Sequence, residues 1–186
     1  VLGRASFGEV MQARDTRLGR SVTLRTVRLD SEHANAGRSF LDAVRVLAKI
    51  TDPNCTEVYS VLPPEDGVDV HVVAMEFVDG PSLADHAPTT EPADAIRLMD
   101  GVLRGLSTLH GRGIAHGHPS PHNIRLADGD TPKICGAGFS EDPDTERAWA
   151  LAAPEVLLGR GTSVASDVFS AAAIIWWLAS RTPPFS

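Results

Sequence analysis

The chain has 186 residues, a length that suits one domain or two lobes that share one site. A hydrophobic fraction of 42% beside 22% charged residues is typical of a globular protein with a buried core. The net charge of −7 and the lack of any Lys/Arg run argue against nucleic acid as a partner.

Cysteine usage and hydropathy indicate the compartment. Cys55 and Cys135 are the only cysteines and lie far apart in the sequence, so we interpret them as free thiols in a reducing compartment. The longest apolar run, residues 171–179, is too short to span a bilayer and predicts a buried helix. No signal peptide opens the chain, and its first residue already belongs to a motif. We expect a cytoplasmic domain cut from a longer parent protein, whose own membrane attachment stays open.

Residues 1–28 alternate and turn at glycines, which predicts strands. The first turn lies within Gly3-Arg4-Ala5-Ser6-Phe7-Gly8-Glu9-Val10, and the next strand contains Val22-Thr23-Leu24-Arg25. A glycine-spaced hairpin is by itself more often an ordinary turn than a phosphate site. Arg25 by itself fits a charge at a strand edge as well as it fits a phosphate contact.

Residues 38–50 predict an amphipathic helix, which Asp52-Pro53-Asn54 ends. Its apolar face comprises Phe40, Val44, Leu47 and Ile50. Two predicted strands, Val58–Leu62 and Val70–Phe77, follow around a Pro- and Gly-containing turn. The turn-rich residues 79–90 then indicate a boundary between two lobes.

The second half of the chain is predicted to be mostly helical. A helix over residues 91–110 has an apolar stripe of Ile96, Met99, Leu103, Leu106 and Leu109. The polar loop His116-Gly-His-Pro-Ser-Pro-His-Asn123 follows it, and a short strand, residues 124–126, comes next. A second strand runs into Gly136-Ala137-Gly138, and an apolar helix begins near Ser166.

The order and spacing of these segments resemble the protein kinase family, in the style of bacterial Ser/Thr kinases. The family motifs are Gly-x-Gly-x-x-Gly-x-Val, Val-Ala-Ile-Lys, His-Arg-Asp-Leu-x-x-x-x-Asn, Asp-Phe-Gly and Ala-Pro-Glu. They correspond here to residues 3–10, 22–25, 116–123, 136–138 and 153–155. The resemblance implies one α+β domain over residues 1–186 with the bilobal kinase-like fold. Residues 1–78 would form a small β-rich N-lobe and hinge, and 79–186 a mostly helical C-lobe that lacks its last helices.

The resemblance also shows which reactive groups are changed. The catalytic Asp position holds His118, the metal-binding Asp position holds Gly136, and only Asn123 is retained. A neutral imidazole can accept a proton, but it supplies no negative charge for a hydroxyl or a metal. Ala43 occupies the position of the Glu that pairs with the strand Lys. The neighbouring Asp42 should point elsewhere, because one residue is a 100° rotation on a helix.

If ATP binds, the resemblance places the nucleotide against a defined set of residues. These are Gly3, Gly8, Val10, Arg25, Glu76 and Val78, the last two through backbone groups at the hinge. Asn123 would be the one remaining metal ligand. Arg125 stands where the family has an apolar floor for adenine, and a charged floor disfavours a flat apolar base.

Two further features of the loop have structural explanations. The resemblance makes His116 a histidine packed in the core, and it makes Asp167 the residue that fixes the loop backbone by hydrogen bonds. Alternatively, His116, His118 and His122 could be metal ligands. No Asp, Glu or Cys lies within the loop to complete such a site.

We therefore interpret the chain as a pseudokinase, a regulatory or protein-binding module in signalling that needs neither ATP nor Mg²⁺. Its partners would be proteins, such as another kinase or a phosphoprotein-binding domain. The first alternative is a divergent, ATP- and Mg²⁺-dependent serine/threonine kinase that uses His118 as base and Asn123 together with an acidic residue recruited from 141–144. The second alternative is a different, metal-dependent chemistry at the histidine loop.

Overall fold

A five-stranded sheet and two long helices are the largest elements of the structure, a computed structural model that describes residues 3–5, 8–28, 34–64, 70–87, 90–138, 150–182 and 184–185. The chain divides into two units. The first comprises Val1–Thr51 and Thr56–Phe77, and the second comprises Asp52–Cys55 and Val78–Ser186. The sequence placed a single division after Val78, so the assignment of residues 52–55 to the second unit is new.

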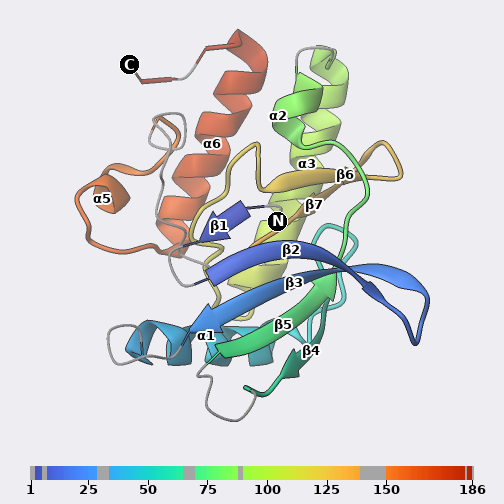
Figure 1. Ribbon diagram of the computed structural model, residues 1–186. Coiled ribbons are helices and arrows are strands. Elements are labelled where there is room, and N and C mark those ends of the chain that lie inside the picture. Colours follow the sequence, from blue (N-terminus) through green and yellow to red (C-terminus); the bar gives the residue numbers. More distant parts are fainter. Residues whose placement is uncertain are drawn as a thin grey trace. The chain divides into compact units, whose positions relative to one another are not determined.

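The sheet of the first unit is antiparallel throughout, with the strand order β1-β2-β3-β5-β4 (Figure 1). Its strands are β1 (Gly3–Ala5), β2 (Gly8–Asp15), β3 (Arg20–Arg28), β4 (Val58–Leu62) and β5 (Val70–Glu76). The predicted strands are confirmed, although the last one ends at Glu76, one residue before the predicted end at Phe77. β3 lies in the interior of the sheet, between β2 and β5.

The hairpin between β2 and β3 is closed by an aspartate turn. The Oδ1 atom of Asp15 accepts hydrogen bonds from the backbone N–H groups of Arg17 and Leu18, at 3.0 and 3.1 Å. Asp favours such turns because its short side chain can bond backbone groups two and three residues ahead. The turn sets a register in which Val10 lies opposite Arg25.

Helix α1 (Ala34–Leu47) packs its apolar face into the core of the first unit. Phe40, Val44, Leu47 and Ile50 are all buried, as the sequence predicted. The predicted bounds were wrong, because the helix begins four residues earlier than residue 38 and ends at Leu47. Ile50 is buried from the turn that follows, where its N–H bonds the carbonyl of Leu47.

The second unit contains the helices α2 (Leu83–His86), α3 (Pro92–His110), α5 (Pro154–Leu157) and α6 (Val164–Ser180) and the strands β6 (Ile124–Ala127) and β7 (Thr131–Ile134). α3 packs against β7 and α6 (Figure 1). Large side chains with almost no exposure form the core here, namely Leu98, Leu109, Ile124, Leu126, Ile134 and Ile174.

Residues 52–55 join the second unit through hydrogen bonds. The side chain of Asn54 donates to the carbonyl of Pro132 at 2.8 Å, and its own carbonyl accepts from the N–H of Ile134 at 2.8 Å. The Thr108 hydroxyl donates to Asp52 at 2.6 Å. This short segment therefore extends the β6–β7 sheet and also bonds α3.

The predicted apolar stripe of α3 was partly wrong. Met99, Leu106 and Leu109 are buried, but Ile96 is 74% exposed and Leu103 is 44% exposed. Leu98 and Val102 are buried in their place. The reason is that α3 packs on two elements, so its buried surface is rotated away from the single stripe that periodicity indicates.

Helix α6 was predicted to be buried, and one of its faces is not. A capping box between Ser163 and Ser166 begins the helix. Along the exposed face, apolar residues recur at steps of three and four. They are Ala165, Val168, Ala172, Ile175 and Ala179, with Trp176 beside them at 56% exposure.

Both cysteines are free thiols, as predicted. Burial, with a smaller contribution from the Asp52 carboxylate, raises the pKa of Cys55 to about 12.

In the part of the chain that the structure describes, no helix has the length and apolar character needed to cross a membrane.

Candidate functional site

The glycine hairpin of the first unit has a packing explanation at Gly8. A Cβ atom at this position would lie 2.1 Å from the carbonyl oxygen of Thr26, which no side chain tolerates. The N–H of the next residue, Glu9, donates to the Thr26 hydroxyl at 2.7 Å. Gly8 is thus required by the close approach of β2 to β3, whether or not a phosphate binds. Ser6 and Phe7, the tip of the hairpin, lie outside the described residues.

The register of the sheet brings three of the predicted binding residues onto neighbouring strands. Gly3 lies opposite Val10, and Val10 lies opposite Arg25. Arg25 is 5% exposed and sits on an interior strand, with Val73 on its other side. The interpretation of Arg25 as a charge at a strand edge is therefore wrong. A contact between Arg25 and a phosphate stays a prediction.

The hinge residues have backbone groups that are already used. The N–H of Glu76 donates to the carbonyl of Glu57 at 2.8 Å, and its carboxylate accepts from the N–H of Glu57 at 3.2 Å. In the second unit, the carbonyl of Val78 accepts from the N–H of Gly80 at 3.2 Å, and the Val78 side chain is buried. The Glu76 N–H, a single donor, would have to exchange its partner before it could bond a ligand, whereas a carbonyl oxygen such as that of Val78 can accept a second hydrogen bond.

A buried carboxylate holds the polar loop of residues 116–123 in the second unit. Asp167 is completely buried, and it accepts from the backbone N–H of His116 at 2.6 Å and of Gly117 at 2.9 Å. The Nε2 atom of His110, at the end of α3, lies 2.8 Å from the same carboxylate. These contacts confirm the predicted role of Asp167. His110 was missed, because nothing in the α3 pattern distinguishes it from a helix-terminal histidine.

His116 is a core histidine, as predicted. It is 1% exposed, its Nε2 atom lies 3.0 Å from the carbonyl of Cys135, and its Nδ1 atom accepts from the N–H of His118 at 3.3 Å. Burial lowers the pKa of His116 to about 4, although the Asp167 carboxylate acts in the opposite direction. A neutral imidazole is therefore the form that the fold requires.

The Asn123 side chain bonds the backbone of His118 across the loop. The side-chain amide of Asn123 donates to the carbonyl of His118 at 3.1 Å, and its backbone N–H bonds Ser120. The carbonyl of Asn123 accepts from the N–H of Cys135 at 2.7 Å. The loop is thus closed by its own hydrogen bonds, and it brings together the two predicted catalytic residues.

The Gly136-Ala137-Gly138 segment packs beside this loop. The N–H of Gly138 donates to the carbonyl of His116 at 3.0 Å, and Ala137 is buried. Gly136 has a φ of +81°, and a Cβ atom there would meet open space. Its positive φ, rather than crowding, is what favours glycine here.

The loop offers little to a divalent cation. Mg²⁺ prefers carboxylate oxygens in near-octahedral geometry. Positions 118 and 136 provide an imidazole and no side chain, so the side-chain oxygen of Asn123, whose NH₂ group donates to the His118 carbonyl, is the one oxygen ligand left at these three positions. Among the residues that the structure describes, no group of three or more His, Cys, Asp or Glu side chains could hold a metal ion. Residues 141–144, the proposed source of a substitute carboxylate, lie outside them.

Arg125 lies in β6 and bonds the chain that enters the second unit. Its Nη2 atom donates to the carbonyl of Gly80 at 2.7 Å. The nearby Asp85 caps α2 together with Ser82, and the Ser82 hydroxyl is the main cause that holds the pKa of Asp85 below its usual value. Asp85 was missed, although the Ser-x-x-Asp spacing of a capping box is visible in the sequence.

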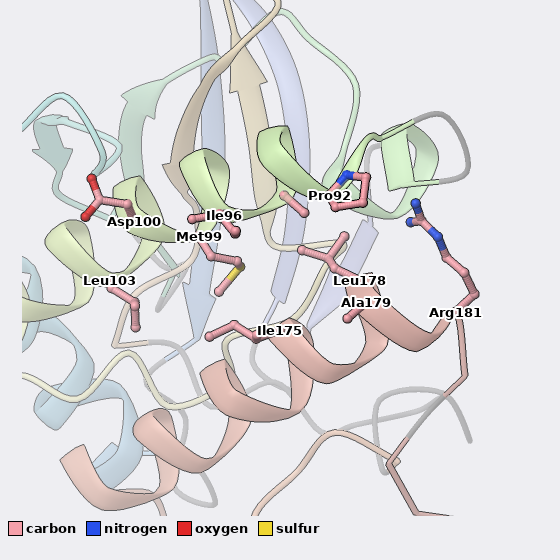
Figure 2. Close-up of a pocket in the computed structure, with 10 residues that line it drawn as sticks. Pro92, Ile96, Met99, Asp100, Leu103, Ile175, Leu178, Ala179 and Arg181 are labelled. Atoms are coloured by element: carbon pink, nitrogen blue, oxygen red, sulfur yellow. The ribbon is translucent and has the colours of Figure 1, made fainter.

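A separate apolar groove of about 590 Å³ lies between α3 and α6 (Figure 2). It is lined by Ile96, Met99 and Leu103 from α3 and by Ile175, Leu178 and Ala179 from α6. Figure 2 shows Asp100 and Arg181 at its opposite ends. The guanidinium of Arg181 donates to the carbonyls of Ala87 and Thr90. No predicted site residue lines this groove.

Comparisons with known proteins agree along the whole chain. The family model described as "Protein kinase domain" matches residues 1–186. A probable serine/threonine-protein kinase of Streptomyces coelicolor is 27% identical over 201 residues, which cover 100% of this chain and 30% of that protein. A putative CBL-interacting protein kinase of Oryza sativa subsp. japonica is 29% identical, with 100% and 49% covered. The serine/threonine-protein kinase PknB of Mycobacterium leprae is 26% identical, with 100% and 32% covered. The chain thus spans less than half the length of these relatives.

Proposed function

The chain belongs to the protein kinase family, and we propose that it is a pseudokinase, a kinase fold that serves as a regulatory, protein-binding module in signalling. One observation supports this proposal. The loop of residues 116–123 keeps its backbone anchored to Asp167, while position 118 holds a histidine and position 136 holds a glycine. The frame that positions the chemistry is present, and the carboxylates that perform it are replaced.

The energetic argument rests on how kinases work. Phosphoryl transfer is catalysed almost entirely by positioning and by stabilisation of charge, so the loss of both carboxylates removes the larger part of the catalysis. His118 could hold a proton, but it cannot balance metal ions or orient a hydroxyl by negative charge. Because the residues present do not fit Mg²⁺, we derive no metal-dependent step.

Partners are proposed from the same reasoning. A kinase fold without transfer chemistry can still present a surface, and its partners would be proteins such as another kinase or a phosphoprotein-binding domain. No bound nucleotide is required for this role. We place it in the cytoplasm, because its two cysteines are free thiols, as is usual in a reducing compartment.

The first test is a thermal-shift titration of the purified chain with ATP, with and without Mg²⁺. A ligand that binds the native state raises the melting temperature, by an amount that grows with its concentration. We expect no Mg²⁺-dependent rise at millimolar ATP. A rise without Mg²⁺ would fit a pseudokinase that senses nucleotide, whereas a rise only with Mg²⁺ would favour the divergent kinase.

The second test is a phosphotransfer assay with radiolabelled ATP on the chain itself and on a general protein substrate. We expect no Mg²⁺-dependent transfer above the background of a heat-denatured sample. His118→Ala serves as the test variant, and His122→Ala, an exposed histidine of the same loop, is its control. Transfer that His118→Ala abolishes and His122→Ala retains would contradict the proposal.

A further inference from the structure

Shortly after Val78, where the chain enters the second unit again, the backbone bonds β6. We call Gly80–Ser82 the latch segment. The N–H of Leu126 donates to the carbonyl of Pro81 at 3.0 Å, and Ser82 forms an antiparallel bridge with Arg125. The chain passes from the first unit to the second after Phe77, so the latch segment is an early anchoring point of that connection.

The backbones approach each other closely at Gly80. A Cβ atom there would lie 1.8 Å from the carbonyl oxygen of Leu126. Any other residue would push the latch segment off the strand, because backbone atoms at that distance cannot yield. The sequence thus contains a glycine where these two backbone segments meet.

The arginine side chain adds a bond that a β-strand does not normally provide. The Nη2 atom of Arg125 donates to the Gly80 carbonyl at 2.7 Å, a charge-assisted hydrogen bond of ordinary length. The Arg125 side chain is half-buried, and its Nε atom is buried without a hydrogen-bond partner among the described residues. A guanidinium that could extend into water instead bonds the backbone and leaves one donor unsatisfied.

The far end of the latch segment, Ser82, is hydrogen-bonded to the first turn of α2. The Ser82 hydroxyl donates to the Asp85 carboxylate at 2.6 Å, and that carboxylate also accepts from the Ser82 N–H at 3.2 Å. Arg125 and His122 act electrostatically on the same carboxylate and favour its charged form. Arg125 is therefore electrostatically coupled to both ends of the segment.

We propose that Arg125 is a latch that holds Gly80–Ser82 against β6 and so fixes where the connection between the two units leaves the second unit. This role goes beyond the proposed function, because it requires neither a nucleotide nor a partner. Arg125 acts here as a positioning residue. In its absence the antiparallel bridge remains, but the Gly80 carbonyl loses its charged donor.

Amide hydrogen exchange of the full chain tests the latch. In Arg125→Met, we expect the Leu126 amide, which bonds Pro81, to exchange about tenfold faster, the effect of losing one hydrogen bond of average strength. The Ile134 amide, which bonds Asn54 on the far side of the same hairpin, should keep its rate. Arg125→Lys, which retains a charged donor, should restore part of the protection.

The control is Lys133→Met, which removes the cation directly opposite Arg125 on β7. It should leave the Leu126 amide unchanged. Equal acceleration in the two Met variants, or an unchanged Leu126 rate in Arg125→Met, would overturn the proposal. If Arg125→Met exposed Leu126 and Ile134 equally, the residue would support the whole hairpin rather than the latch segment, and the proposal would also be wrong.

Discussion

At the scale of single residues, Asp167 is the side chain that anchors the backbone of the polar loop, residues 116–123. Its carboxylate is buried and faces two backbone N–H donors and the ring of His110. A buried carboxylate of this kind is stabilised only while its hydrogen-bond partners remain. The loop and α6 are therefore energetically linked through one side chain.

Replacing this carboxylate with an amide should be costly. In Asp167→Asn, an NH₂ group must face a backbone N–H donor, so we expect the free energy of unfolding to fall by about 2–4 kcal/mol. Urea denaturation followed by circular dichroism measures the loss. Asp100→Asn, at a carboxylate that is 62% exposed and paired with Arg104, should change stability little. Equal losses in the two variants would contradict this role of Asp167.

The buried His116 predicts a specific pH dependence. Its pKa is lowered from 6.5 to about 4 by burial, with His118 and His110 acting in the same direction and Asp167 and the Cys135 carbonyl opposing them. As the pH falls below 6.5, the unfolded chain binds a proton that the folded chain does not bind. Stability is thus fully present above pH 6.5 and decreases as the pH falls toward 4.

The size of this effect can be measured by comparison with a variant. Between pH 7 and pH 5, His116 should account for about 2 kcal/mol of the decrease in the free energy of unfolding. His116→Gln lacks the titrating ring, so its decrease over the same interval should be smaller by that amount. Urea denaturation at the two pH values gives the comparison, and identical decreases in both proteins would show that His116 does not titrate as proposed.

At the scale of elements, α6 begins with a capping box whose contribution to stability can be tested. The Ser163 hydroxyl accepts from the N–H of Ser166, and the Ser166 hydroxyl accepts in return from the N–H of Ser163. Ser163→Ala should lower stability by about 1 kcal/mol, as for other helix N-caps. Thr162→Ala, one residue before the cap and exposed, should have no measurable effect in the same urea experiment.

The elements also show what a sequence can and cannot predict. The strands of the first unit were predicted well, because alternation and turn residues are local signals. The stripe of α3 was wrong at Ile96 and Leu103, because periodicity cannot reveal that the helix packs on both β7 and α6. The predicted helix bounds were also shifted, because the residues at which a helix begins and ends are hard to locate without the backbone geometry.

The candidate site was predictable only in part. His116 and Asp167 were assigned correctly because the resemblance to kinases supplied a contact that spans 51 residues. The bond from Arg125 to Gly80 spans 45 residues and has no counterpart in any motif, so the sequence could not indicate it. The burial of Arg25 was likewise invisible until the order of the strands was known.

At the scale of the whole molecule, retained and altered positions are distributed unevenly. The positions that organise backbone, such as Gly8, His116 and Asp167, are kept and can be explained by packing or hydrogen bonds alone. The positions that would carry negative charge to a substrate, 118 and 136, are the changed ones. These packing and hydrogen-bond roles do not depend on phosphotransfer, so stability and phosphotransfer must be measured separately.

The exposed face of α6 has a practical consequence for anyone who purifies this chain. Val168, Ile175 and Trp176 are exposed to water on this helix, and Ile175 also lines the groove between α3 and α6. Sulfate and other strongly hydrated salts favour the burial of such surfaces. The chain should therefore be retained on hydrophobic-interaction resin and salt out early, and low-sulfate buffers at modest protein concentration will keep it in solution.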